Sequence, residues 1–160
     1  MDRRAFLRAT ATGVAALALA QDALSAEMYF PSKVDPKLFQ DINRVKDPAN
    51  KTGLEKTHAP VIKAPAEVKA EEPFVVEVSV GEALHVMGQA HWIEYIELNV
   101  GNEPAGRVDF QSRGYLKPRA SFTVVLGKDL AAAGKVTLVA YQRCNLHGYW
   151  EGSADVKVTA

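Results

Sequence analysis

The sequence predicts an all-β protein built as an antiparallel β-sandwich, and three observations support this fold class. Several short stretches alternate apolar and polar residues, which is the pattern of half-buried strands. Glycines separate these stretches. No stretch between them has the length and period of a crossover helix, so a parallel sheet is not expected. The clearest alternation is in 74–80, where one face carries Phe74, Val76, Val78 and Val80.

The other elements are predicted in the same way along the chain. The further strands are expected at 61–62, 67–70, 92–100, 107–111, 121–126, 136–142 and 155–159. One helical turn is expected at 129–133. Before the strands, Asp35 can cap a short helix over 36–43, which Asp47-Pro48 would prevent from continuing.

The first 26 residues are typical of an export signal and not of a folded domain. Arg3-Arg4 followed by Ala-Phe-Leu is a twin-arginine pattern, so the protein is expected in the periplasm. The apolar run 10–20 is too short to span a bilayer, which needs roughly 20 such residues. Cleavage is expected after Ala26, and no cysteine lies there to carry a lipid anchor.

The expected mature chain has two parts. Residues 27–52 are rich in proline and charge, and we interpret them as an arm packed on the domain formed by 53–160. A length of 160 residues, with 48% hydrophobic and 24% charged, favours a single domain. The 19 basic residues balance the 19 acidic ones, so nothing concentrates positive charge for nucleic acid.

The chain has one cysteine and four histidines, which makes any metal site easy to search for. A single cysteine excludes an intrachain disulfide and a tetracysteine zinc site. All five residues fall at predicted strand ends or in loops, and loops at one end of a sandwich can converge on one point. The candidate ligands are His58, His85, His91, Cys144 and His147.

The donor set favours iron over zinc and copper. Structural zinc takes four ligands in a tetrahedron, so five is one too many. Blue copper needs a weak axial ligand, usually a methionine just beyond the second histidine, and none follows His147. Iron accepts nitrogen and sulfur ligands, and five of them leave one corner of an octahedron open for a small oxidant.

Three motifs in this order resemble the neelaredoxin-type superoxide reductases, whose iron domain also occurs in desulfoferrodoxin. The motifs are Glu-Lys…His-x-Pro at 55–60, His-x-Met-x-x-x-His-x-Ile at 85–93 and Cys-Asn-x-His-Gly-x-Trp at 144–150. Together they use every histidine and the only cysteine. The resemblance covers about residues 50–158 and implies an immunoglobulin-like sandwich of about seven strands.

The resemblance implies one iron ion per chain, Fe²⁺ or Fe³⁺, with four equatorial histidines and an axial Cys144. It implies that the protein reduces superoxide to hydrogen peroxide. It also implies a small electron-donor protein as partner, rubredoxin-like or other, and assembly into a homodimer or homotetramer. It also gives Glu55 and Lys56 catalytic roles, at the sixth corner and in attracting superoxide. Here Thr57 precedes His58, so Glu55 and Lys56 each stand one position further from this histidine than in the family. In an extended segment, a shift of one residue turns a side chain to the opposite face of the strand.

Two other functions remain open on sequence grounds. One is a non-catalytic periplasmic module that carries electrons or sulfur compounds on the same fold, which the altered position of Thr57 favours. The other is a thiol enzyme with Cys144 as nucleophile, but this leaves three histidines unexplained.

Overall fold

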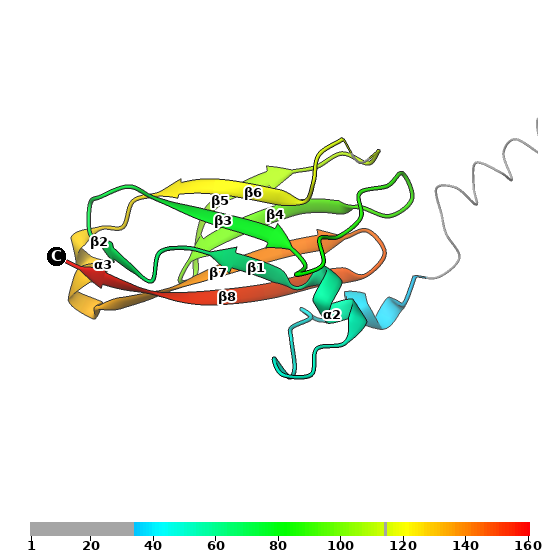
Figure 1. Ribbon diagram of the computed structural model, residues 1–160, viewed down its shortest axis with the longest axis horizontal. Helices are drawn as coiled ribbons and strands as arrows, with labels where there is room; N and C mark the ends of the chain where they lie inside the picture. Colours follow the sequence, from blue (N-terminus) through cyan, green and yellow to red (C-terminus); the bar gives the residue numbers. More distant parts are fainter. Residues whose placement is uncertain (1–33, 114) are drawn as a thin grey trace, which may run out of the picture. The chain divides into compact units, whose positions relative to one another are not determined.

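Two sheets pack face to face in the structure, a computed structural model that describes residues 34–113 and 115–160 (Figure 1). The predicted signal and the first part of the predicted arm lie outside the described residues. The three-stranded sheet has the order β1-β3-β6, with bounds Pro60–Lys63, Phe74–Val80 and Arg119–Val124. The five-stranded sheet has the order β2-β8-β7-β4-β5, with bounds Glu67–Lys69, Gly148–Thr159, Lys135–Cys144, Ile93–Val100 and Glu103–Asp109.

The predicted β-sandwich is confirmed, with differences in detail. Among the described strands, only the pairing of β2 with β8 is parallel. β8 begins at Gly148, well before the predicted strand 155–159, because its first half pairs with β7 although its sequence alternates poorly. β5 runs over Glu103–Asp109, whereas 107–111 was expected.

Within the described residues, three short helices accompany the strands. A 3-10 helix η1 covers Pro36–Phe39, and the Asp35 side chain accepts from the Lys37 amide as predicted, although the helix ends before residue 43. Helix α3 covers Lys128–Ala133, close to the expected turn. No helix in the described part of the chain has the length and apolar character needed to cross a membrane.

Helix α2, at Gly53–His58, was not predicted, and the expectation of an extended segment there is wrong. Its start is a capping box, in which the Thr52 hydroxyl accepts from the Glu55 amide and the Glu55 carboxylate accepts from the Thr52 amide. The reversal of faces argued for Glu55 and Lys56 therefore does not apply, because it holds only for strands.

The core fills the space between the sheets and reaches the end where β7 turns into β8. Alternation along β7 buries Val136, Leu138, Ala140, Gln142 and Cys144. Helix α2, the β3–β4 loop and the β7–β8 turn lie at this same end of the sandwich (Figure 1). We refer to it below as the histidine end.

Candidate metal centre

Helix α2 positions His58 at its last residue. The His58 side chain is 3% exposed, and its Nδ1 lies 2.9 Å from the Leu54 carbonyl oxygen and 2.8 Å from Thr57 Oγ1. The helix end is tied to the β3–β4 loop because the Ala83 amide donates to the Lys56 carbonyl. His58 is thus held by its own helix and by the neighbouring loop.

The β3–β4 loop carries His85 and His91 to the same point. The His85 amide donates to the Val80 carbonyl as the chain leaves β3. Between the two histidines the Gly88 amide donates to the His91 carbonyl at 2.8 Å, which closes a tight loop. His85 is 4% exposed, and His91 is half-buried.

The β7–β8 turn supplies Cys144 and His147. Cys144 is the last residue of β7 and is fully buried, and it pairs with Gly148 at the start of β8. Gly148 has φ of 70°, and a Cβ atom there would lie 1.9 Å from the Leu38 carbonyl oxygen. Only glycine fits this position, so the turn after His147 requires it.

The four imidazoles meet in a closed ring of short nitrogen–nitrogen contacts. His58 Nε2 lies 3.1 Å from His85 Nε2 and 2.9 Å from His147 Nδ1. His91 Nε2 completes the ring, at 3.0 Å from His85 Nε2 and 3.1 Å from His147 Nδ1. Neighbouring rings stand at 75–83° to each other, so all four point a nitrogen at a common centre.

The cysteine sulfur completes the cluster. Cys144 Sγ lies 3.1 Å from His91 Nε2, 3.5 Å from His147 Nδ1 and 3.7 Å from His85 Nε2. All five ligand atoms fall within 4.8 Å of one another. The structure therefore brings together every candidate ligand that the sequence analysis proposed.

The hydrogen bonds of His58 and His85 show that the Nε2 atoms of the two rings do not form a hydrogen bond with each other. A carbonyl oxygen only accepts, so the contacts of Nδ1 with the Leu54 and Val86 carbonyls place the proton on Nδ1 of each ring. Both Nε2 atoms then carry a bare lone pair, and they face each other at 3.1 Å. Two lone pairs at this distance repel unless a cation lies between them.

A transition-metal ion fits the centre of this ring. A square with edges near 3 Å holds its corners about 2.1 Å from its centre, which matches a metal–imidazole bond. Carbonyl oxygens on the far nitrogens of ligating histidines are the usual support that fixes the ring orientation. Four imidazoles and one sulfur suit iron, as argued above from the donor set.

Burial keeps the imidazoles neutral in the metal-free protein. It lowers the pKa of His58 from 6.5 to about 3 and of His85 from 6.5 to about 4, with a further lowering from the neighbouring imidazoles. The pKa values of His91 and His147 are also lowered, mainly by burial. Neutral imidazole is the form that binds a metal.

Cys144 responds to burial in the opposite direction. Burial raises the pKa of its thiol from 9.0 to about 11, although the backbone amides of Leu146 and His147 donate to the sulfur and oppose this change. The Asn145 amide donates to the Trp92 carbonyl instead. Binding of a metal must therefore release the thiol proton.

The two residues expected to act beside the metal are placed differently from each other. Both carboxylate oxygens of Glu55 accept backbone hydrogen bonds, from the amides of Lys46 and Thr52, and the side chain is buried. These bonds lower the pKa of Glu55. Lys56 is exposed next to it on α2. Neither belongs to the cluster of ligand atoms, and their catalytic roles stay a prediction.

Three polar side chains that support the ligands were not foreseen. Asn145 Oδ1 accepts from the Trp92 amide, and Asn145 Nδ2 donates to the Ala90 carbonyl. The Asn145 side chain therefore binds the backbone on both sides of His91. Gln142 and Trp150 contact the backbones of other ligands, as described below. The sequence held one signal for them, because Gln142 is a polar residue at an inward position of an apolar strand.

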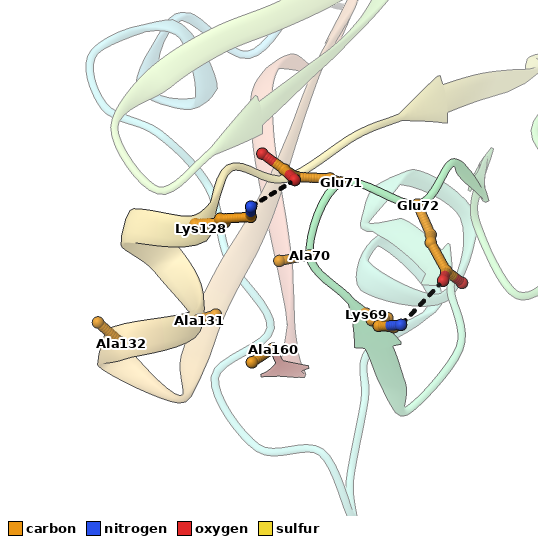
Figure 2. Close-up of a pocket in the computed structure, with 8 residues that line it drawn as sticks. All are labelled: Lys69, Ala70, Glu71, Glu72, Lys128, Ala131, Ala132 and Ala160. Atoms are coloured by element: carbon orange, nitrogen blue, oxygen red, sulfur yellow. Dashed lines mark ion pairs between the residues drawn. The ribbon is translucent and has the colours of Figure 1, made fainter.

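A cavity of about 640 Å³ lies at the other end of the sandwich, between α3 and the end of β2. Figure 2 shows that its charged side chains pair with each other, Lys128 with Glu71 and Lys69 with Glu72, while alanines line the rest. Each charged side chain drawn there has a partner, and among the described residues the group that could hold a metal is the histidine–cysteine cluster instead.

Comparisons with known proteins agree with the geometry. The family model described as Desulfoferrodoxin matches residues 50–153. A neelaredoxin superoxide reductase from Ignicoccus hospitalis is 38% identical, with a TM-score of 0.61 and coverage of 79% of this chain and 99% of that one. A protein of Methanocaldococcus jannaschii, provisionally named a superoxide reductase, is 37% identical over 115 residues, 72% of this chain and 92% of its own.

A more distant solved structure has a similar fold. The reduced neelaredoxin superoxide reductase of Archaeoglobus fulgidus is 26% identical, with a TM-score of 0.54 over 72% of this chain and 98% of that one. The family model spans most of the described domain and includes all five converging residues. The chain therefore belongs to the desulfoferrodoxin family of iron-binding superoxide reductases, within which it is of the neelaredoxin type.

Proposed function

We propose that this protein reduces superoxide to hydrogen peroxide at one mononuclear non-haem iron ion. His58, His85, His91, His147 and Cys144 would hold the iron, with their ligand atoms all within 4.8 Å of one another. The observation that carries this proposal is the ring of four imidazole nitrogens with edges of 2.9–3.1 Å beside a buried sulfur. Family membership supports the same conclusion.

The arrangement suits the reaction because sulfur occupies only one side of the nitrogen ring. Iron held there would supply the redox chemistry: one electron, with two protons from solvent, converts superoxide to hydrogen peroxide, and a donor protein would restore the electron. The Leu146 and His147 amides donate to the sulfur and so adjust how much charge the thiolate gives to the metal. Burial of Cys144 behind the ring keeps solvent from this side of the site.

Lys56 is proposed to attract the superoxide anion. It is exposed on α2, two residues before His58, and it has no acidic partner among the described ion pairs. Glu55 acts near the sixth position only if it gives up its bonds to the amides of Lys46 and Thr52, so we propose that it mainly anchors α2.

The electron donor is proposed to be a small redox protein that docks at the histidine end. His91 and His147 are the half-buried ligands, so they are the shortest path from the surface to the metal. A homo-oligomer is proposed as well. Sedimentation of the purified protein, alone and with reduced rubredoxin, tests both expectations.

Pulse radiolysis tests the enzymatic function. The reduced, iron-loaded protein should be oxidised by a pulse of superoxide and yield one hydrogen peroxide per iron without release of oxygen. A non-catalytic carrier of the same fold is not favoured, and it would bind iron yet react with superoxide no faster than the protein loaded with zinc. Release of oxygen would contradict reductase activity and indicate dismutation.

The site of action is proposed to be the periplasm. The support is the twin-arginine pattern at Arg3-Arg4, which lies outside the described residues. Cell fractionation should find the wild-type chain in the periplasm and a variant with Lys at both positions in the cytoplasm. Equal distribution of the two would contradict export by this route.

A further inference from the structure

Gln142 makes a buried contact with the backbone of a candidate iron ligand. Its Nε2 donates to the His58 carbonyl at 2.9 Å, and the side chain is 0% exposed. His58 is the last residue of α2, where a helix leaves carbonyl groups without a partner inside the helix. The bond crosses between the sheets, because β7 belongs to the five-stranded sheet and β1, which follows α2, to the other.

Trp150 makes the equivalent contact with a second ligand. Its indole Nε1 donates to the His147 carbonyl at 2.9 Å, and its ring lies 5.5 Å from the His58 ring. Gln142 and Trp150 are register partners on β7 and β8, and both are buried. Directly opposed residues of an antiparallel pair project from the same face of the sheet, so both side chains point toward the candidate metal site.

The core itself gives no reason for a glutamine at this position. Gln142 Oε1 has no hydrogen-bond partner among the described residues, although it is buried. A buried acceptor without a partner destabilises a protein, and an apolar side chain of the same length would avoid this loss. The contact with His58 is the one evident gain that the amide brings.

We propose that Gln142 and Trp150 are positioning residues of the iron centre. They hold the backbones of His58 and His147, whose ligand nitrogens are neighbours at 2.9 Å in the ring. The two residues belong to the hairpin whose turn carries Cys144, two residues after Gln142. The pair therefore fixes two of the four ring nitrogens relative to the Cys144 sulfur. The proposal rests on the iron site of the proposed function, and it does not require turnover.

The test compares Gln142→Met and Trp150→Phe with the wild-type protein. The first keeps length and loses the donor, and the second keeps the ring next to His58 and loses the indole N–H. Each protein is loaded with Fe³⁺ or with Co²⁺, and the rate of metal loss to a chelator is measured together with the sulfur-to-metal absorption band. We expect metal loss to be about 10- to 100-fold faster, with a shifted band, as for other residues that orient metal ligands.

Asn99→Leu is the matched control. Asn99 lies on β4, is 9% exposed and also has a buried carbonyl oxygen without a partner, but it contacts no ligand in the described structure. This variant should keep the wild-type band and rate of metal loss. Thermal melts of the metal-free proteins distinguish unfolding from displacement of the ligands. Gln142→Met should melt near the wild-type temperature.

Two results would overturn the proposal. One is a rate of metal loss within about twofold of wild type in both variants with an unshifted band, because orienting residues have larger effects. The other is an equal change in the Asn99→Leu control. If Gln142→Met does not fold, Trp150→Phe decides alone by the same criteria. A wild-type protein that binds iron with this band but does not reduce superoxide would contradict the proposed function and leave this proposal intact.

Discussion

The two ends of the sandwich arrange their polar groups in opposite ways. At the α3 end, charged side chains line an open cavity and pair with each other near the surface, as Lys128 does with Glu71 (Figure 2). At the histidine end, four neutral imidazoles and a thiol face one another in the interior without any compensating charge. The first arrangement is complete as it stands, whereas the second is complete only with a cation.

This contrast shows why the volume of a cavity is a poor guide to function in this protein. The four charged side chains that line the cavity of about 640 Å³ at the α3 end form two ion pairs, and exposed ion pairs of this kind contribute little, about 0–1 kcal/mol. The candidate metal site is marked instead by five ligand atoms within 4.8 Å of one another. The informative feature is a set of lone pairs that converge at 2.9–3.1 Å.

Replacement of Cys144, the proposed axial ligand, should have the largest effect on the metal centre. Cys144→Ser should remove the sulfur-to-iron charge-transfer colour of the oxidised protein, because no other cysteine exists in the chain. Visible absorption of the iron-loaded protein measures this. Lys128→Ala at the α3 end is the control and should keep the full colour. Colour retained in Cys144→Ser would contradict the axial assignment.

Acid should destabilise the metal-free protein through the histidine end. Below about pH 6.5 the unfolded chain takes up a proton at His58 and His85, but the folded protein does not until the pH nears their lowered pKa values of about 3 and about 4. The free energy of unfolding should therefore fall as the pH drops from 6.5 to 4. Each unit of pKa lowering corresponds to about 1.4 kcal/mol.

Urea unfolding of the metal-free protein at pH 7.5, 6, 5 and 4.5 measures this slope. His85→Leu should flatten it, because that variant removes one of the two buried imidazoles. A stability that stays constant or rises over this interval would show that the imidazoles are not held neutral.

Loss of the Asn145 bridge should have an intermediate effect. Asn145→Ala removes the bonds to the Ala90 carbonyl and the Trp92 amide, so His91 loses its fixed backbone. Iron affinity should fall about 10-fold, and stability by about 1–3 kcal/mol. Competition with a chelator and thermal unfolding measure the two. Unchanged affinity with reduced stability would mean that Asn145 supports only the turn.

Changes at the start of α2 should have the smallest effects on the metal. Glu55→Ala removes half of the capping box and should cost about 1 kcal/mol of stability. Lys56→Ala should slow the encounter with superoxide less than about 10-fold at low salt. Thermal melts and pulse radiolysis at two salt concentrations measure these. A large change of the ferric spectrum in Glu55→Ala would indicate that Glu55 does reach the sixth position.

The sequence alone was sufficient to predict much of the fold and all five candidate ligands. The alternation in 74–80 and along β7 predicted strands because a half-buried strand needs a period of two. The five candidate ligands were found because the chain has only four histidines and one cysteine. Helix α2 was not predicted, because its six residues have a polar surface and show no helical period of apolar residues. The capping box is the only sequence signal of this helix.

The chemistry of the donor set was decided by the sequence, and its geometry only by the tertiary structure. Histidine and cysteine types define which metal can bind, and this is a property of the side chains themselves. The closure of the nitrogen ring depends on contacts between residues far apart in the chain, such as Gln142 with the His58 carbonyl and Asn145 with the loop that holds His91. Such contacts depend on how two sheets and three loops pack, which no local pattern of residues records.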